Sequence, residues 1–169
     1  MIETERLLLR RVDPERDFEP WARTMADARV VRFLGAAPMG RALAWRHMAS
    51  IVGHWAIRGY GFFSVEEKAT GQWVGRVGPW YPEGWPAPEI GWTLSPDHWG
   101  KGYATEAARA AVAYAFDTLE WPSVVHVILP GNARSIAVAE RLGSRFLRSE
   151  NGLDGVTDRE VLIYGQDAP

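Results

Sequence analysis

One stretch constrains the fold more than any other: residues 90–115, which read IGWTLSPDHWGKGYATEAARAAVAYA. It begins as a short apolar strand, breaks at a proline and two glycines, and continues as a long helix of small residues. Gly100 and Gly102 permit backbone conformations and close approaches that residues with side chains resist. The first N–H groups of a helix lack intrahelical partners, so they and the positive end of the helix dipole attract anions. With Lys101 adding positive charge, the stretch predicts a phosphate-binding site, although a tight strand-to-helix turn without a ligand explains the glycines equally well.

Pattern and composition exclude several other functional classes. The Walker loop G-x-x-x-x-G-K-[ST] is absent, and Thr105 stands where the dinucleotide pattern G-x-G-x-x-G needs its third glycine. The 169 residues hold 19 Lys and Arg against 21 Asp and Glu, a net charge of −2, without a basic stripe. Nucleic-acid binding is therefore not supported. The chain has no cysteine, which excludes disulfides, thiol nucleophiles and cysteine-ligated zinc.

The overall balance is that of a soluble enzyme. Hydrophobic residues make up 47% of the chain and charged residues 24%, which is ordinary for a globular domain. The first five residues are acidic rather than basic, unlike a secretion signal, and no run of about 18 apolar residues could span a membrane. We expect one cytoplasmic domain over residues 1–169 that binds neither nucleic acid nor membrane.

Periodicity and turn residues predict a mixed α/β fold with about six to seven strands and about four helices. The predicted strands are residues 6–12, 60–66, 72–80, 89–94, 124–129, 146–148 and 159–164. The predicted helices are residues 13–26, 41–57, 101–116 and 132–142, with a broken piece at 30–34. Asp13, followed by a proline, is an expected N-cap, and Gly143 an expected helix end. We expect strands 89–94 and 124–129 to run parallel through the intervening helix, and a glycine-rich loop at residues 151–155.

The strongest loop signal lies at residues 79–88, which read PWYPEGWPAP. Four prolines prevent a regular strand ladder there. Trp80, Tyr81 and Trp85 with Glu83 form either a self-packed surface cap or a wall that contacts a ligand. The sequence supports both interpretations.

Several motifs resemble the GNAT N-acetyltransferases, in the order that this family has them. WGKGYA at residues 99–104 is similar to the family's pyrophosphate loop, with Trp99 in place of the usual Gln or Arg. EIGW at residues 89–92 and TERL at residues 4–7 resemble the RimJ/RimL-type branch. Asn132-x-x-Ser135 and Arg141-Leu142-Gly143 resemble it too, with Ser144 where a Phe commonly follows. The resemblance spans about the whole chain and implies a central, mostly antiparallel twisted sheet, with homodimerisation as a family-level expectation.

The resemblance also implies acetyl-CoA as the cofactor and acyl transfer to an amine as the reaction. Coenzyme A would then be bound by the end of the central strand, the glycine loop, the start of the long helix and the start of a later one. The implied residues are Thr93, Leu94, Trp99, Gly100, Lys101, Gly102, Tyr103, Ala104, Thr105, Asn132 and Ser135. An N-cap role alone also explains Asn132.

Acyl transfer needs a base for the amine, a donor for the carbonyl oxygen and a proton for the leaving thiolate. Glu89, an acid at the start of an apolar strand, is the expected base. The alternatives are that Glu89 is a purely structural carboxylate and that Glu83 of the exposed loop is the base. A backbone N–H near Leu94 is the expected oxygen donor on the family's pattern. The family's tyrosine acid is missing, because its position holds Ala139, so Ser135 is the expected acid, or else a helix contact. The four histidines lack metal-ligand spacing, and no metal site is predicted.

Trp80, Tyr81, Glu83, Trp85 and Glu89 are the expected acceptor-binding residues, because aromatic faces and carboxylates attract an ammonium group. The sequence therefore predicts transfer of an acetyl group from acetyl-CoA to a primary amine by direct attack in a ternary complex. The amine is that of a protein N-terminus or of a small molecule. The alternative is a non-catalytic acyl-CoA-binding module that senses the cofactor or uses it for assembly.

Overall fold

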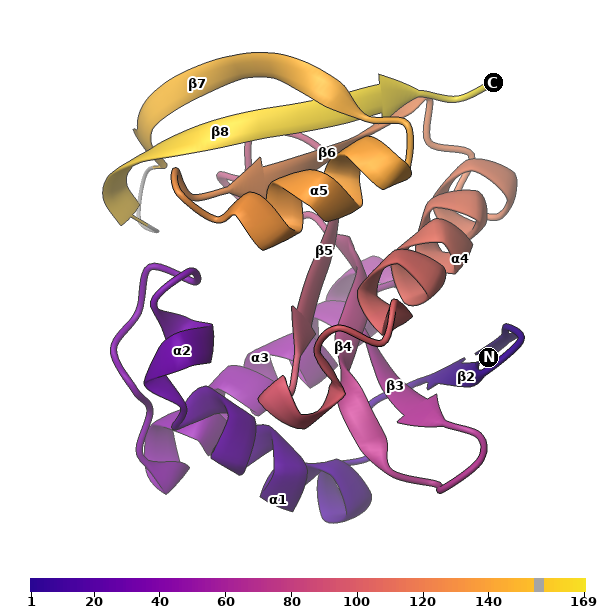
Figure 1. Cartoon of the computed structure of the whole chain (residues 1–169), viewed down its shortest axis with the longest axis vertical. Helices are drawn as coiled ribbons and strands as arrows, with labels where there is room; N and C mark the ends of the chain where they lie inside the picture. The colour runs from indigo at the N-terminus through magenta and orange to yellow at the C-terminus, as the bar shows by residue number, and fades with distance from the viewer. Residues whose placement is uncertain (154–156) are drawn as a thin grey trace.

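A single twisted sheet organises the chain, of which the computed structural model describes residues 1–153 and 157–169 (Figure 1). Its strand order is β1-β2-β3-β4-β5-β6-β8-β7, and every neighbouring pair is antiparallel except β5 and β6. The described strands are β1 (Ile2–Glu3), β2 (Leu7–Arg10), β3 (Phe63–Glu67), β4 (Trp73–Trp80), β5 (Glu89–Leu94), β6 (Ser123–Ile128), β7 (Arg145–Leu153) and β8 (Thr157–Asp167).

The parallel pair β5–β6 forms a fork. The two strands are in register at Glu89↔Val125 alone, where the Val125 N–H donates to the Pro88 carbonyl at 2.9 Å. Beyond that point β5 turns away from β6, as Figure 1 shows. The parallel orientation predicted for these strands is confirmed. The sheet is thereby opened in its middle, between the β1–β5 part and the β6–β8–β7 part.

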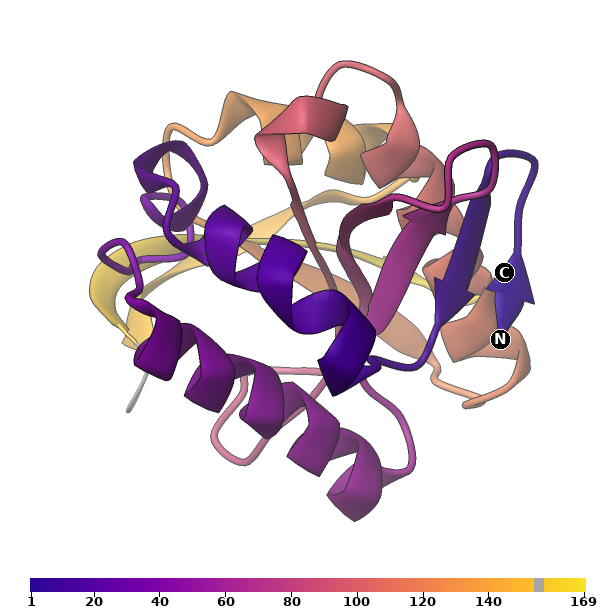
Figure 2. The ribbon, with the colours of Figure 1, turned by 90° about the horizontal axis from the view of Figure 1, so that it is seen from below.

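Helices cover both faces of the sheet. Those on one face are α1 (Pro14–Met25), α2 (Ala28–Val31) and α3 (Arg41–Arg58), and those on the other are α4 (Tyr103–Asp117) and α5 (Ala133–Arg141), with a short 3₁₀ turn η1 (Pro96–His98) before α4. Figure 2 shows α1 and α3 side by side. Their core includes Trp21, Met48 and Ile51. On the other face, Ala107, Ala108 and Ala111 of α4 are fully buried, so the small-residue stripe brings this helix close to the sheet.

The predicted mixed fold is confirmed, with corrections to the counts. The described chain has eight strands rather than six or seven, and five α-helices rather than four. The additions are β1, which is two residues long, and α2, which is four residues long and overlaps the broken piece predicted at residues 30–34. Elements this short show no period in the sequence. The last two strands are also longer than expected. Strand β7 includes residues 151–153 of the predicted loop, and β8 runs over Thr157–Asp167 rather than residues 159–164. Residues 154–155 of the predicted loop lie outside the described residues.

Helix ends follow the chemistry of their caps. The Asp13 side chain accepts from the backbone N–H groups of Glu15 and Arg16 and caps α1, as predicted. Gly143 has φ +93° just after α5, also as predicted. Helix α4 begins at Tyr103 rather than at residue 101, because Gly102 is its N-cap in the left-handed region.

A buried ion pair fixes α1 against the sheet. Arg10 of β2 donates to both carboxylate oxygens of Asp17, at 2.9 and 2.7 Å. Asp17 is 1% exposed and also accepts from the Asp13 N–H at 2.8 Å and the Ser64 hydroxyl at 2.6 Å. A buried charge with this many partners stabilises one arrangement of helix on sheet.

Within the described residues, no helix has both the length and the apolar character that a membrane crossing requires. The same part of the chain contains no cluster of three or more His, Asp or Glu side chains suited to a metal ion.

Candidate active site

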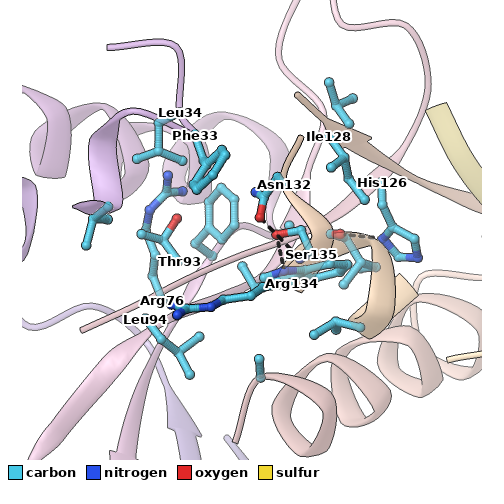
Figure 3. A pocket seen from close by; sticks show the side chains of 18 of the residues that line it. Phe33, Leu34, Arg76, Thr93, Leu94, His126, Ile128, Asn132, Arg134 and Ser135 are labelled. Carbon is cyan, nitrogen blue, oxygen red and sulfur yellow. Dashed lines mark hydrogen bonds between the residues drawn. The ribbon is translucent and has the colours of Figure 1, made fainter. Parts of the chain in front are cut away.

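A cleft of about 1930 Å³ passes through the fork between β5 and β6 (Figure 3). Residues of α2 and α3 line it on one face of the sheet, and the start of α4 and of α5 line it on the other. Because one continuous cleft joins both faces, two ligands that enter from opposite faces can meet at the fork.

The glycine loop forms one wall of this cleft. Gly100 and Gly102 have φ values of +78° and +80°, which residues other than glycine rarely adopt. The first helix bond of α4 runs from the Glu106 N–H to the Gly102 carbonyl, so the N–H groups before Glu106 have no acceptor within the helix. Tyr103, Ala104 and Thr105 line the cleft with these glycines, whereas Lys101 does not; its ammonium group lies 5.7 Å from the centre of the Tyr103 ring.

Two residues of the TERL motif hold this loop in place. Arg6 forms an ion pair with Glu106 in the first turn of α4, at 2.6 Å, and donates to the Lys101 carbonyl at 3.0 Å. The Thr4 hydroxyl donates to the same Glu106 carboxylate at 2.6 Å. The hydrogen bond to Arg6 raises the pKa of that guanidinium, and hydrogen bonds from Thr4 and Arg6 help to lower the pKa of Glu106 against the opposing effect of burial. The N-terminal strands therefore fix the position of the α4 amides.

Trp99 joins three elements at the mouth of the cleft. Its indole N–H donates to the Leu94 carbonyl at 3.0 Å. The guanidinium of Arg134 lies 4.7 Å from the ring centre and that of Arg29 lies 5.8 Å from it. Arg134 reaches from α5 into the cleft in Figure 3. A cation thus stands beside the position where the family usually has Gln or Arg.

Basic side chains dominate the charge of the cleft wall. Seven arginines line the cleft. One is Arg76 of β4, and the other six come from the segment before β2, from α2 and its C-cap, from α4 and from α5: Arg6, Arg29, Arg32, Arg109, Arg134 and Arg141. Such a wall attracts a polyanionic ligand, and together with the free amides of α4 it fits the phosphates of coenzyme A.

Backbone N–H groups of β5 face the fork. The Ser95 N–H donates to the Val74 carbonyl of β4, at 2.9 Å. Alternate residues of a strand direct their N–H and C=O groups to opposite edges. The N–H and C=O groups of Trp92 and Leu94 are therefore directed away from β4, toward the edge that faces β6. Trp99 and His126 donate to the Leu94 and Ile90 carbonyls on that same edge. The Leu94 N–H is therefore directed at the open fork, where sequence analysis expected the donor for the carbonyl oxygen.

Asn132 and Ser135 lie together at the start of α5 (Figure 3). The Asn132 side chain accepts from the Ser135 N–H at 3.2 Å and is the N-cap of α5. The Ser135 hydroxyl accepts from the Trp92 indole N–H at 3.2 Å, which leaves its own proton available to a ligand. Ala139 is fully buried, so the position of the family's tyrosine belongs to the core here.

Glu89 lies at the apex of the fork and is 6% exposed. One carboxylate oxygen accepts from the Val127 N–H at 3.0 Å and the other from the Trp85 indole N–H at 2.7 Å. Burial raises the pKa of Glu89 to about 7, against the opposing effects of these hydrogen bonds and of Arg76. The carboxyl group therefore joins the two strands, as a structural acid would, and is also poised to exchange a proton near neutral pH.

The aromatic loop contributes some of its predicted residues to the cleft. Trp80, Glu83 and Trp85 line it with Glu89, whereas Tyr81 does not. The Trp80 ring stacks on His54 at 4.4 Å between ring centres. Glu83 is exposed and lies 3.8 Å from Arg58. The loop is therefore partly a packed cap and partly a wall of the cleft.

Sequence analysis missed Arg76, which lies on β4 opposite Thr93. Both side chains are buried, both line the cleft, and Figure 3 shows them beside each other. Burial lowers the pKa of Arg76 to about 10. The signal was a single arginine inside the otherwise uncharged run WVGRVGPW.

Sequence analysis also missed a relay of hydrogen bonds behind the fork. His126 is 1% exposed; its Nδ1 lies 2.7 Å from the Ile90 carbonyl oxygen and its Nε2 lies 2.9 Å from the Ser144 hydroxyl. Burial lowers the pKa of His126 to about 4, so the ring is neutral, with Nδ1 donating to Ile90 and Ser144 donating to Nε2. Gln166 donates to Ser144 at 2.9 Å. This relay explains why serine rather than phenylalanine follows Leu142-Gly143.

The comparisons with known proteins agree with this geometry. A family model described as an acetyltransferase (GNAT) domain matches residues 6–145. The protein YkkB of Bacillus subtilis (strain 168) is 38% identical over 96 residues, which cover 54% of this chain and 56% of that protein. The match thus spans little more than half of that relative's length.

Solved structures extend the similarity over the whole chain. An acetyltransferase from Agrobacterium tumefaciens str. C58 superposes with a TM-score of 0.85 at 33% identity, covering 99% of this chain and 94% of that chain. RimL, a ribosomal L7/L12 α-N-protein acetyltransferase in complex with coenzyme A, has a TM-score of 0.79 at 17% identity over 97% of this chain and 95% of that chain, a likeness of fold. The chain therefore belongs to the GNAT family of acetyltransferases, whose acetyl donor is acetyl-CoA.

Proposed function

We propose that this protein transfers an acetyl group from acetyl-CoA to a primary amine by direct attack at the fork between β5 and β6. The observation that carries the proposal is the fork between β5 and β6. The β5 edge directs the Leu94 N–H into this opening, and the N-terminus of α4 lies on one side of the same cleft. The absence of cysteine from the sequence favours direct transfer over a thioester formed on the enzyme.

The residues present fit coenzyme A. The amides of Tyr103, Ala104 and Thr105, held in place by Arg6, suit a pyrophosphate group. The arginines of α2, α4 and α5 add positive charge around it, and Asn132 and Ser135 suit the polar groups of a pantetheine arm. When bound, acetyl-CoA supplies the thioester that is cleaved.

The chain supplies a base, an oxygen donor and an acid. Glu89, with a pKa of about 7, accepts a proton from the amine directly or through water near neutral pH. The Leu94 N–H donates to the carbonyl oxygen as negative charge develops on it. The Ser135 hydroxyl donates a proton to the departing thiolate and takes one back from water, while Glu89 releases its proton to solvent.

The amine approaches from the face covered by α1, α2 and α3. Trp80 and Trp85 present aromatic surface there, and such surface attracts an ammonium group by about 0.5–2 kcal/mol. Trp85 also orients Glu89 through its indole N–H. Replacing Trp85 by Ala should therefore raise the KM for the amine and disturb Glu89, while leaving the affinity for acetyl-CoA unchanged.

An amine panel tests the proposal. The protein is incubated with acetyl-CoA and single amines, thiol release is followed by absorbance, and acetylated products are identified by mass spectrometry. We expect release of coenzyme A in step with acetylation of at least one primary amine. Tight binding of acetyl-CoA in calorimetry without transfer to any amine would favour a non-catalytic acyl-CoA-binding module instead.

A further inference from the structure

The cleft contains a buried cation without a protein partner. Arg76 is 7% exposed, and its Nε is fully enclosed with no hydrogen-bond acceptor. Within the described residues, none of its guanidinium nitrogens forms a side-chain hydrogen bond or an ion pair. Arg10, a half-buried arginine on the same sheet face, pairs with both Asp17 and Glu66. Because a buried charge without a partner is strongly unfavourable, Arg76 calls for a ligand that supplies one.

The position of Arg76 on the sheet indicates which of the two substrates, the amine or acetyl-CoA, it faces. It lies on β4 opposite Thr93, whereas Trp80 of the same strand lies opposite Glu89. All four side chains are on one face of the sheet because they alternate by two residues, and that face is the one covered by α1, α2 and α3. The glycine loop and the arginines suited to the phosphates of coenzyme A are on the α4 and α5 side. Arg76 therefore faces the amine rather than the acetyl donor.

Apart from Glu89, whose charge acts on Arg76 without a hydrogen bond or ion pair, the described surroundings of Arg76 are mainly aromatic. Its guanidinium lies 4.0 Å from the centre of the Phe62 ring and 5.8 Å from that of Trp21. The nearby His47 is neutral, because burial and the charge of Arg76 lower its pKa to about 3. The Phe62 ring also covers Gly91, where an added Cβ would lie 2.9 Å from a ring carbon. A flat apolar surface thus joins the cation to the apex of the fork, where Glu89 lies.

We propose that the acceptor is a small amine that also carries a carboxylate, with the carboxylate bound by Arg76 and the amino group directed toward Glu89. The opposite charges of Arg76 and Glu89 on one wall match the two ends of such a zwitterion. Because the Arg76 side chain is so little exposed, only a compact anion can reach its guanidinium. The carboxylate of an amino acid is small enough to do so. This inference rests on the proposed function for its chemistry and adds the class of acceptor.

Matched pairs of ligands test the inference by binding. The twenty common amino acids, their amides and the corresponding decarboxylated amines are titrated by calorimetry into the protein saturated with coenzyme A. An ion pair with hydrogen bonds to a buried guanidinium predicts that the best acid binds about 10- to 100-fold more tightly than its amide. A ratio near one for every pair would overturn the inference.

Three variants locate the effect. Arg76→Gln should reduce the acid-to-amide ratio to near one, Arg76→Lys should retain part of it, and Arg46→Gln, an exposed change on α3, should leave it as in the wild type. A ratio that survives in Arg76→Gln would overturn the assignment. If thermal melting shows that Arg76→Gln does not fold, the test uses the wild type and Arg76→Lys instead. A high acid-to-amide affinity ratio in the wild type that falls in Arg76→Lys supports the assignment, and a ratio that is the same in both proteins would overturn it.

A peptide arm distinguishes the source of the carboxylate. Asp-Ala-Ala-amide and Asn-Ala-Ala-amide differ only in the acid beside the free N-terminus. We expect the free amino acid to bind better than either peptide; a preference for the acidic peptide alone would overturn the small-molecule assignment.

Acetyl transfer to the same panel separates this inference from the proposed function. Acid-dependent binding that requires Arg76 but is never followed by transfer would overturn the function and retain the anion site. Transfer to acids and amides at equal kcat/KM, equally lowered by Arg76→Gln, would retain the function and reduce Arg76 to a support for Glu89.

Discussion

Gly102 offers the sharpest test of the phosphate site, through its replacement by Val. The residue has φ +80°, and an added Cβ would lie 3.4 Å from the Arg6 Nη2. A left-handed conformation costs a residue with a side chain about 1–2 kcal/mol, and a β-branched residue is especially unsuited to it. If the variant keeps this conformation, the cost appears in the free energy of unfolding, and the branched side chain pushes against Arg6, which holds the loop through the Lys101 carbonyl. If the variant relaxes, the α4 amides turn away and the cost appears in ligand affinity.

Gly59 provides a matched control for this change. It has φ +78°, with no atom within 4 Å of an added Cβ, and it ends α3 away from the cleft. Gly59→Val should lose a similar amount of stability and bind coenzyme A as the wild type does. Gly102→Val should bind it at least about 10-fold more weakly, or 1.4 kcal/mol, in calorimetry on samples whose folding is checked by circular dichroism. Unchanged affinity in a folded Gly102→Val protein, or an equal loss in Gly59→Val, would refute the assignment of the phosphates to this loop.

Three further substitutions probe the acid, the anchoring ion pair and the relay behind the fork. Ser135→Ala should lower kcat more than it raises the KM for acetyl-CoA; a change in KM alone would make Ser135 a binding contact. Asp17→Asn removes the buried carboxylate that pairs with Arg10, which then keeps only Glu66 as a charged partner. It should lower the free energy of unfolding by about 1.5–3 kcal/mol in urea denaturation, and a loss below about 1 kcal/mol would show the pair to be dispensable. Ser144→Ala leaves His126 and Gln166 without a shared partner and should cost about 1–3 kcal/mol in the same assay, whereas unaltered stability would count against the relay.

Sequence patterns sufficed for much of the fold because its longer elements have clear periods and caps. Strand 89–94 and the Asp13 and Gly143 helix ends were predicted where they are found. The two-residue β1 was not predicted, and the four-residue α2 was expected only as a broken piece at residues 30–34, because elements this short carry no period. The oxygen donor near Leu94 was expected on the family's pattern alone. The fork that exposes it depends on packing between distant residues such as His126 and Ile90.

The site was predictable where it is continuous in the sequence. The glycine loop and the acid before β5 are contiguous motifs, and most of their residues line the cleft. Lys101 and Tyr81 were expected there and lie outside the lining, because the direction of a side chain in a loop is set by neighbours far along the chain. Arg76 and Ser144 gain their environments only through pairing of β4 with β5 and of β6 with β8, which no local pattern reports.

The pH dependence of acetyl transfer tests the central claim, that the fork is a catalytic site with Glu89 as its base. With the pKa of Glu89 raised to about 7, kcat/KM should rise as pH increases through that value, because the carboxylate is the active form. Glu89→Gln is compared in a Trp85→Phe background, which removes the indole donor that would otherwise face the new amide. Two acceptors whose amine pKa values differ by about one unit separate ionisation of the enzyme from that of the substrate. The account predicts a rise near pH 7 that is common to both acceptors and lost in the Gln variant, with rate recovered only where the amine deprotonates unaided. An unchanged profile in that variant would contradict it.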